Sequence, residues 1–347
     1  MPKTQNRAVM IWLFIFAFGV AFLVVWGGYT RLTRAGLSIV EWNPISGAIP
    51  PLSPQAWQEE FAKYQKTPEF IQVNSNMTLA EYEYIFYIEW FHRLIARAAG
   101  LIYALPVFFF LFTKRIPWKE FGIYFAMGML FISQAFAGWY MVASGLVDRP
   151  SVSHYLLTFH LFLALTLFGL SLWTALGHLR GFPVRAAKFS LPSKLSVAVF
   201  VILLIQIAYG GLTAGLKAGH VSNTWPLMMG QLIPNGLLSA LQPWTLNLFD
   251  TPQTVAFIHR WFAFAVLAGA VGVYLTAARL KLPKEARNAA LILVGLIVDQ
   301  ILFGIGVVIF NVQIGVALFH QTMAIILFAA MLNLIHHMRA ADHNVSP

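Results

Sequence analysis

Four histidines are the residues of this chain best suited to chemistry. His92, His160, His259 and His320 each lie near the outer end of a different predicted membrane-spanning helix. Neutral imidazole is a good iron ligand, and two imidazoles can hold a haem iron from opposite faces. A single histidine near a membrane interface is more often a hydrogen-bonded residue than a ligand, so the prediction depends on all four being at repeat-equivalent positions. That arrangement predicts two bis-histidine haem sites, His92 with His160 and His259 with His320.

The composition places these histidines in a membrane protein. Hydrophobic residues make up 59% of the chain and charged residues only 10%, whereas a soluble domain has roughly 25% charged residues. A helix needs about 20 apolar residues to cross about 30 Å of hydrocarbon. Eight such segments are predicted, near residues 10–28, 90–112, 120–142, 155–177, 195–216, 255–278, 289–310 and 316–338. The chain is therefore predicted to be an all-α polytopic membrane protein with eight transmembrane helices.

The basic residues set the predicted orientation. In an eight-span arrangement most of them fall on one side, which the positive-inside rule makes cytoplasmic. They are Lys3, Arg7, Lys114, Arg115, Lys119, Arg180, Arg185, Lys188, Lys194, Arg279, Lys281, Lys284, Arg287 and Arg339. Both termini are then cytoplasmic, and the long loops near 29–88 and 217–254 lie with the haem sites on the periplasmic side of a bacterial inner membrane. The formal charge of +10 is thus explained by the basic residues on the cytoplasmic side, and it does not indicate nucleic-acid binding.

An internal repeat divides the chain. Gly27-Gly28-Tyr29-Thr30 aligns with Gly210-Gly211-Leu212-Thr213. With loop lengths allowed to differ, the further equivalents are His92-Arg93 with His259-Arg260, Gln134 with Gln300, Gly138 with Gly304, and His160 with His320. The repeat predicts two pseudo-symmetric four-helix bundles, residues 1–180 and 181–347. In each bundle the second and fourth helices are diagonal neighbours, so their histidines can face each other across the core.

Two local patterns predict helices on the outer side. Thr78-Leu79-Ala80-Glu81 is a capping box, which starts the helix of His92 before it enters the membrane. Ser53-Pro54, followed by Trp57, Phe61 and Tyr64, predicts a short amphipathic helix that caps the first bundle.

Arginines accompany the histidines. Arg93 and Arg260 directly follow a histidine, and Arg97 lies one turn after Arg93. At the outer interface these side chains are predicted to pair with haem propionates, because carboxylates need cationic donors where water is scarce. The chain has no cysteine, which excludes a disulfide, a thiolate metal site and covalent haem attachment.

Glu89 is the candidate catalytic carboxylate. It lies three residues before His92, on the same face of the helix, whereas Ala256 occupies the equivalent position before His259. A carboxylate there could relay protons or stabilise positive charge, so the first site is predicted to perform chemistry and the second to transfer electrons. The alternative is a simple ion pair with Arg93. Asp299, the other intramembrane acid, has no assigned role.

Taken together, these motifs resemble those of the haem A synthase family over nearly the whole chain. The matching residues are Glu89-Trp90-Phe91-His92-Arg93, Arg97, His160, Ile258-His259-Arg260, His320 and the segment 27–37. The resemblance implies oxidation of the C8 methyl of haem O to a formyl group by successive hydroxylations, giving haem A for cytochrome oxidase. It also implies that His92 and His160 flank haem O or haem A, with Glu89 as the catalytic acid. His259 and His320 would then ligate a haem B cofactor.

The sequence also leads to alternative functions and to expected partners. The absence of cysteine resembles the branch of the family found in proteobacteria and mitochondria. The main rival is a di-haem b-type electron-transfer cytochrome, such as a quinol oxidoreductase subunit, which usually carries two ligands on one helix. A transporter would show discontinuous helices at the membrane midplane. The expected partners are haem O, the haem O synthase that supplies it and an unidentified membrane electron acceptor, and a homo-oligomer stays an open alternative.

Overall fold

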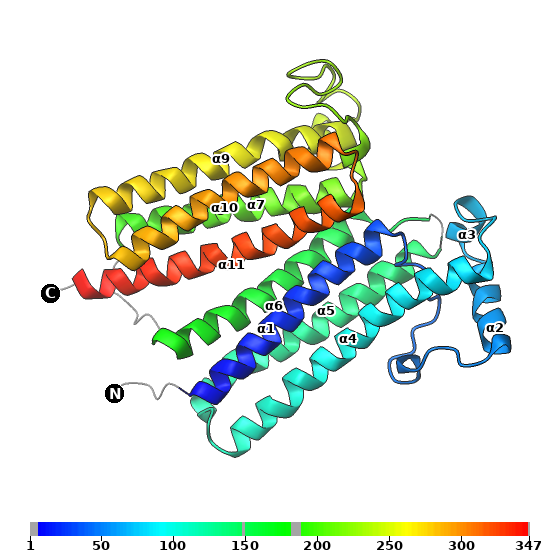
Figure 1. The fold of residues 1–347 in the computed structure, drawn as a ribbon, viewed down its shortest axis with the longest axis horizontal. Coiled ribbons are helices and arrows are strands. Elements are labelled where there is room, and N and C mark those ends of the chain that lie inside the picture. The colour runs from blue at the N-terminus through cyan, green and yellow to red at the C-terminus, as the bar shows by residue number, and fades with distance from the viewer. Residues whose placement is uncertain (1–5, 148–149, 182–188, 346–347) are drawn as a thin grey trace. The chain divides into compact units, whose positions relative to one another are not determined.

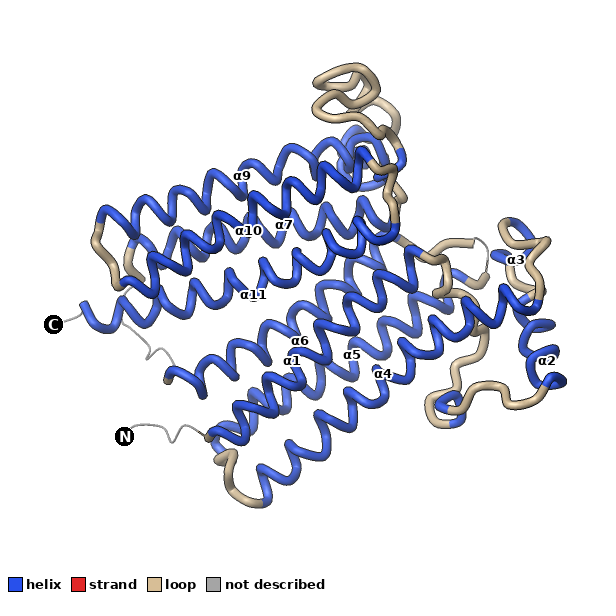
Figure 2. Tube along the Cα trace, viewed as in Figure 1, coloured by secondary structure: helices blue, strands red, loops and turns tan. Residues whose placement is uncertain are grey.

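The protein consists almost entirely of helices in the part of the chain that the structure describes, residues 6–147, 150–181 and 189–345 of a computed structural model (Figures 1 and 2). Eight of the helices are long and apolar enough to cross a membrane, which confirms the predicted fold class. They are α1 (Arg7–Leu32), α4 (Leu79–Phe112), α5 (Phe121–Gly145), α6 (His154–Arg180), α7 (Leu191–Gly215), α9 (Pro252–Arg279), α10 (Lys284–Ile309) and α11 (Ile314–Val345). Of the basic residues used for orientation, Lys3, Arg185 and Lys188 lie outside the described residues.

The contacts divide the chain into two compact units. One comprises residues 15–168 and contains most of α1, all of α4 and α5, and the first part of α6. The other comprises residues 1–14 and 169–347 and contains α7, α9, α10 and α11. Each predicted histidine pair therefore falls inside one unit.

The unit of residues 169–347 is built on a ring of four helices. Helix α7 contacts α9 and α11, and α10 contacts the same two helices, so α9 and α11 are diagonal partners. Small side chains allow the backbones to approach closely, as in other membrane bundles. The fully buried positions of this core include Ala270, Val273, Ala277, Ala290, Leu293, Met331 and Leu334.

Aromatic contacts hold together the unit of residues 15–168. Phe16 of α1 packs on Tyr103 of α4 and on Phe131 of α5, with ring centroids 4.9 Å and 6.2 Å away. Trp26 packs edge-on against Phe91, at 4.7 Å, and its indole N–H donates to a carbonyl of α4. Ring pairs of this kind add about 0.5–1.5 kcal/mol each beyond their buried area. They fix α1 against the helix that carries His92.

The loop between α1 and α4 folds onto the N-terminal part of α4. The capping box is present, with the amide of Thr78 donating to Glu81 at 2.8 Å, and α2 (Pro54–Tyr64) begins at Ser53 as predicted. Helix α2 packs on α4 through Trp57, whose ring contacts Phe86, and through Tyr64, whose ring contacts Tyr82. Helix α3 (Pro68–Gln72) packs on α2 through Phe70, whose ring contacts Tyr64. Burial raises the pKa of the Tyr64 phenol to about 12, so it stays protonated and accepts a hydrogen bond from Asn74. This cap lies directly over the segment that reaches Glu89.

Candidate functional site

The imidazoles of His259 and His320 face each other inside the second unit. His259 lies on α9 and His320 on α11, the two diagonal helices, with ring centroids 6.4 Å apart and ring planes at 87°. A metal ion bound to one nitrogen of each ring would hold the ring centres roughly 6 Å apart, since each metal–nitrogen bond is about 2 Å and each nitrogen lies about 1 Å from its ring centre. The pair therefore has the spacing that one bis-histidine iron requires.

Hydrogen-bonding capacity around the histidines is left unused. The Nδ1 atoms of His160 and His320 are buried and, among the described residues, have no hydrogen-bond partner. A buried polar atom without a partner costs about 1–3 kcal/mol, so such atoms usually mark a site for a ligand or water. Each pair therefore has one imidazole nitrogen that could bind a ligand. Within the first unit, His92 forms a hydrogen bond with the backbone of Leu23.

A glycine of a neighbouring helix lies against each of the four imidazoles. A Cβ atom built on any of these glycines would come within 2.9–3.3 Å of a ring atom. The pairs are Gly27 with His92, Gly138 with His160, Gly210 with His259, and Gly304 with His320. The sequence repeat had aligned Gly138 with Gly304 and the two Gly-Gly pairs with each other, without a contact to the histidines. These four positions therefore favour glycine, because the Cβ atom of any other residue would press on the imidazole ring.

Gly304→Ala tests this glycine contact. The new methyl would lie 3.0 Å from Cε1 of His320, so the ring must shift away from α10 and its placement relative to His259 changes. We expect haem affinity at this pair to fall roughly tenfold or more, as it does when groups orienting a metal ligand are altered. Haem content after purification measures the change. Gly295→Ala on the same helix is the matched control, because its methyl meets open space. Equal haem content in the two variants would show that the glycine contact is unimportant.

Three partly buried glutamines accompany the histidines. Gln134 lies 3.1 Å from Nε2 of His160, and Gln300 lies 3.4 Å from Nε2 of His320 and donates to its carbonyl. Gln206 lies 3.1 Å from Nδ1 of His259 and donates to the carbonyl of the same residue. Groups of this kind orient metal-binding imidazoles. The repeat aligned Gln134 with Gln300 but gave them no role. Nothing in the sequence distinguished Gln206, because the equivalent residue in the first half is Leu23.

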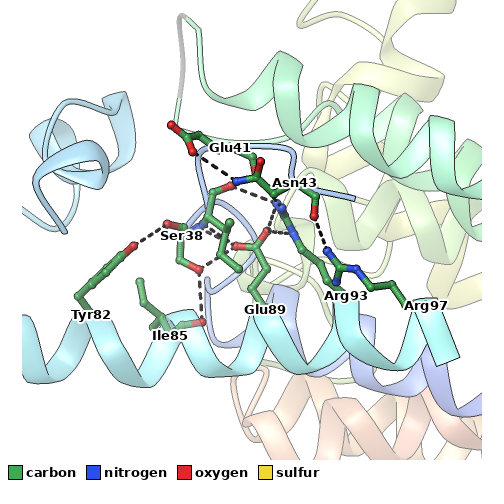
Figure 3. A network of polar contacts seen from close by, with 9 residues as sticks. Ser38, Glu41, Asn43, Tyr82, Ile85, Glu89, Arg93 and Arg97 are labelled. Carbon is green, nitrogen blue, oxygen red and sulfur yellow. Dashed lines mark hydrogen bonds and ion pairs between the residues drawn. The ribbon is translucent and has the colours of Figure 1, made fainter. Parts of the chain in front are cut away.

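Glu89 is buried and accepts five hydrogen bonds (Figure 3). Its Oε2 accepts from the amides of Ser38 and Ile39 and from the Ser38 hydroxyl, at 2.7–3.0 Å. Its Oε1 accepts from Nε and Nη2 of Arg93, at 3.1 and 2.7 Å. The ion pair with Arg93 that the sequence left open is therefore present, within a larger network. An anionic carboxylate suits such a site, because every neighbour donates.

The arginines next to the histidines bind outer-loop backbone. Arg93 donates to the carbonyls of Ile39 and Glu41, and Arg97 donates to two carbonyls further along the same segment. Arg260 does the same in the second half, donating at 3.1 and 2.7 Å to carbonyls at the repeat-equivalent positions 224 and 222. The sequence prediction of propionate binding had not anticipated these contacts, which attach each loop to its histidine-bearing helix.

A cavity of about 250 Å³ adjoins this network. Its wall includes Trp90, Arg93 and Arg97 of α4, together with Glu41 and Gly47 of the loop. Trp90 Nε1 and Arg97 Nη1 are buried donors with no hydrogen-bond partner among the described residues. The cavity therefore offers donors that a carboxylate could use.

Asp299 is the last of the candidate residues from the sequence. It is an exposed residue of α10, and among the described residues no hydrogen bond or ion pair connects it to the histidines. In the described ranges, no three His, Cys, Asp or Glu side chains gather in a way that could hold a separate metal ion.

Known proteins resemble this chain along nearly its whole length. A sequence model of the family described as cytochrome oxidase assembly protein matches residues 10–332. Proteins named Heme A synthase from Mesorhizobium japonicum and Agrobacterium fabrum are each 44% identical to it, over 94% of this chain and 90% and 88% of their own length. The Heme A synthase of Wolbachia sp. subsp. Brugia malayi is 40% identical over 98% of this chain and 99% of its own. The chain therefore belongs to the cytochrome oxidase assembly protein family, as its histidine, arginine and glycine motifs indicated.

Proposed function

We propose that this protein is a haem A synthase, an oxidoreductase that converts the C8 methyl of haem O to a formyl group by successive hydroxylations. The observation that carries the proposal is full-length similarity to proteins named Heme A synthase, in a chain with two intramembrane histidine pairs. The product, haem A, serves cytochrome oxidase, in keeping with the family description. A di-haem electron-transfer cytochrome is not favoured, because each of the four histidines lies on a helix of its own.

The first half, residues 1–180, holds the substrate in this proposal. His92 and His160 would flank the iron of haem O or haem A, because both imidazoles are packed against glycines and one Nδ1 is unpaired. The free donors of Arg97 and Trp90 in the adjoining cavity suit a haem propionate, since a buried carboxylate needs charge-assisted hydrogen bonds. Arg93 would act there mainly through the loop that it holds.

The second half, residues 181–347, holds haem B in this proposal. His259 and His320 have the required separation, and Gln206 and Gln300 orient the two rings. Haem B bound there would supply one-electron oxidation and reduction. Arg260 supports the site by fixing the loop of residues 222–224.

Glu89 would act on the substrate as a fixed anion. It lies one turn from His92, and its five donors hold it in one orientation. A carboxylate held in this way can stabilise positive charge that develops at the oxidised carbon, or accept the proton that leaves it. Preorganised charge is effective because it needs no rearrangement during the reaction.

The topology and partners belong to the same proposal. The distribution of basic residues favours a bacterial inner membrane location with both termini cytoplasmic and both histidine pairs toward the periplasm. Haem O is delivered by a haem O synthase, and a membrane electron acceptor receives the electrons of the oxidation. A homo-oligomer is compatible with this arrangement.

Expression in a bacterial strain that makes haem O but no haem A tests the function. We expect membranes from these cells to contain haem A, identified by chromatography of the extracted haems. Cells with the empty vector are the control. Membranes that contain the protein and haem O but no haem A would contradict the proposal.

A further inference from the structure

Ser38 is a completely buried polar residue to which the mechanism so far gives no role. Its hydroxyl lies 2.7 Å from Oε2 of Glu89, the shortest contact to that oxygen, and its amide donates to the same oxygen at 2.9 Å. The carbonyl of Ser38 accepts a hydrogen bond from the Tyr82 hydroxyl, at 3.3 Å. Ser38 thus lies along α4, between Tyr82, which donates to its carbonyl, and Glu89, which faces its amide and hydroxyl; the hydroxyl also lies 3.4 Å from the carbonyl oxygen of Ile85 (Figure 3).

The segment that follows Ser38 is fastened along one face of α4. Glu89, Arg93 and Arg97 follow one another at intervals of four residues, which places them on one side of the helix. Each binds backbone groups progressively further along the segment 38–44. The position of Ser38 is therefore set by three successive side-chain contacts rather than by one.

The second half lacks this arrangement, although its loop follows the same course. The repeat places Val221 opposite Ser38, Ala256 opposite Glu89 and Phe264 opposite Arg97. Only the arginine contact is shared, since Arg260 binds the carbonyls equivalent to those bound by Arg93. Ala256 instead packs in a small apolar cluster with Ala218 and Met228. The serine and the carboxylate thus occur together in the half assigned to the substrate and are both absent from the other half.

We propose that Ser38 is a positioning residue for the oxidation, and that it acts by holding the Glu89 carboxylate in its reactive orientation. This inference rests on the proposed function, because it assigns the substrate to the first half. The two amides and the hydroxyl together fix Oε2, while Arg93 fixes Oε1. A substitution of Ser38 can remove this hydroxyl and keep the two backbone amides that also donate to Oε2.

Ser38→Ala tests the inference. A hydrogen bond to a charged group contributes about 1.5–3 kcal/mol, so its loss should lower kcat for haem A formation roughly tenfold to hundredfold. The KM for haem O and the haem B content should stay at wild-type values, because Ser38 acts on Glu89 and not on haem binding. Ser38→Thr, which keeps a hydroxyl, should recover much of the lost kcat. Val221→Ala, at the repeat-equivalent position, is the matched control and should retain kcat within about twofold.

A second readout does not depend on turnover. The infrared carboxylate band that disappears in Glu89→Gln identifies the Glu89 side chain, and Ser38→Ala should shift this band because one of its donors is lost. A wild-type protein that makes no haem A would contradict the proposed function, and the infrared band would still test the contact. Wild-type kcat in Ser38→Ala, a raised KM with unchanged kcat, or an unshifted band would overturn the inference.

Discussion

Glu89→Ala is expected to abolish haem A formation while haem B stays bound. The carboxylate lies one turn from His92, and a positioned acid–base or charge-stabilising group typically contributes about 10²–10⁴ in rate. The second histidine pair already has alanine at the equivalent position, so its haem site does not need a carboxylate. Chromatography of haems extracted from cells that make haem O measures both outcomes in one sample.

Two further variants separate the charge of Glu89 from its structural contacts. Glu89→Gln keeps the size of the side chain and one acceptor oxygen, while the NH2 group that replaces the other oxygen cannot accept. Part of the network should therefore remain, and turnover should fall because the charge is lost. Glu83→Ala removes a carboxylate from the same helix outside the network and should leave haem A formation intact. Wild-type haem A levels in Glu89→Ala would remove Glu89 from the mechanism.

His259→Ala and His320→Ala should each remove haem B from the protein. The two imidazoles face each other at 6.4 Å, and either substitution leaves only one of them to bind iron. Losing a direct ligand should cost more than the roughly 10- to 100-fold in affinity that is lost with groups that merely orient one. The optical spectrum and haem content of the purified variants measure this loss.

The matched control for the histidine variants is His220→Ala. His220 is an exposed residue of the outer loop that lies 3.4 Å from the Asn311 side chain, and it should not affect haem content. A normal low-spin spectrum with full haem B in His259→Ala or His320→Ala would refute the assigned ligation.

Much of the architecture could be predicted because its physical causes are local. Eight apolar runs of membrane-spanning length predict eight helices, since backbone groups in hydrocarbon must be hydrogen-bonded within each segment. The capping box at Thr78 and the Ser53-Pro54 start of α2 are short-range patterns, and both are present. The repeat also led to the expectation that His259 and His320 face each other, and in the second unit their rings lie 6.4 Å apart on α9 and α11.

The network around Glu89 could not be predicted, because most of its contacts join residues that lie far apart in the sequence. Arg93 and Arg97 bind carbonyls more than 50 residues away along the chain, and backbone carbonyls carry no residue-specific signal. The sequence alone does not distinguish a buried serine such as Ser38 from a serine in a surface turn. The glutamines beside the histidines had a weak signal, because the repeat aligned Gln134 with Gln300, but their contacts depend on helix rotation.

The central claim is that one histidine pair holds a substrate haem and the other holds haem B. The most direct test is to purify the protein from cells supplied with haem O and to quantify the extracted haems per chain. The account predicts one haem B per chain together with haem O and newly formed haem A, and loss of haem B alone in His320→Ala. Two haem B per chain, with no haem O or haem A, would contradict it and indicate a di-haem electron-transfer cytochrome.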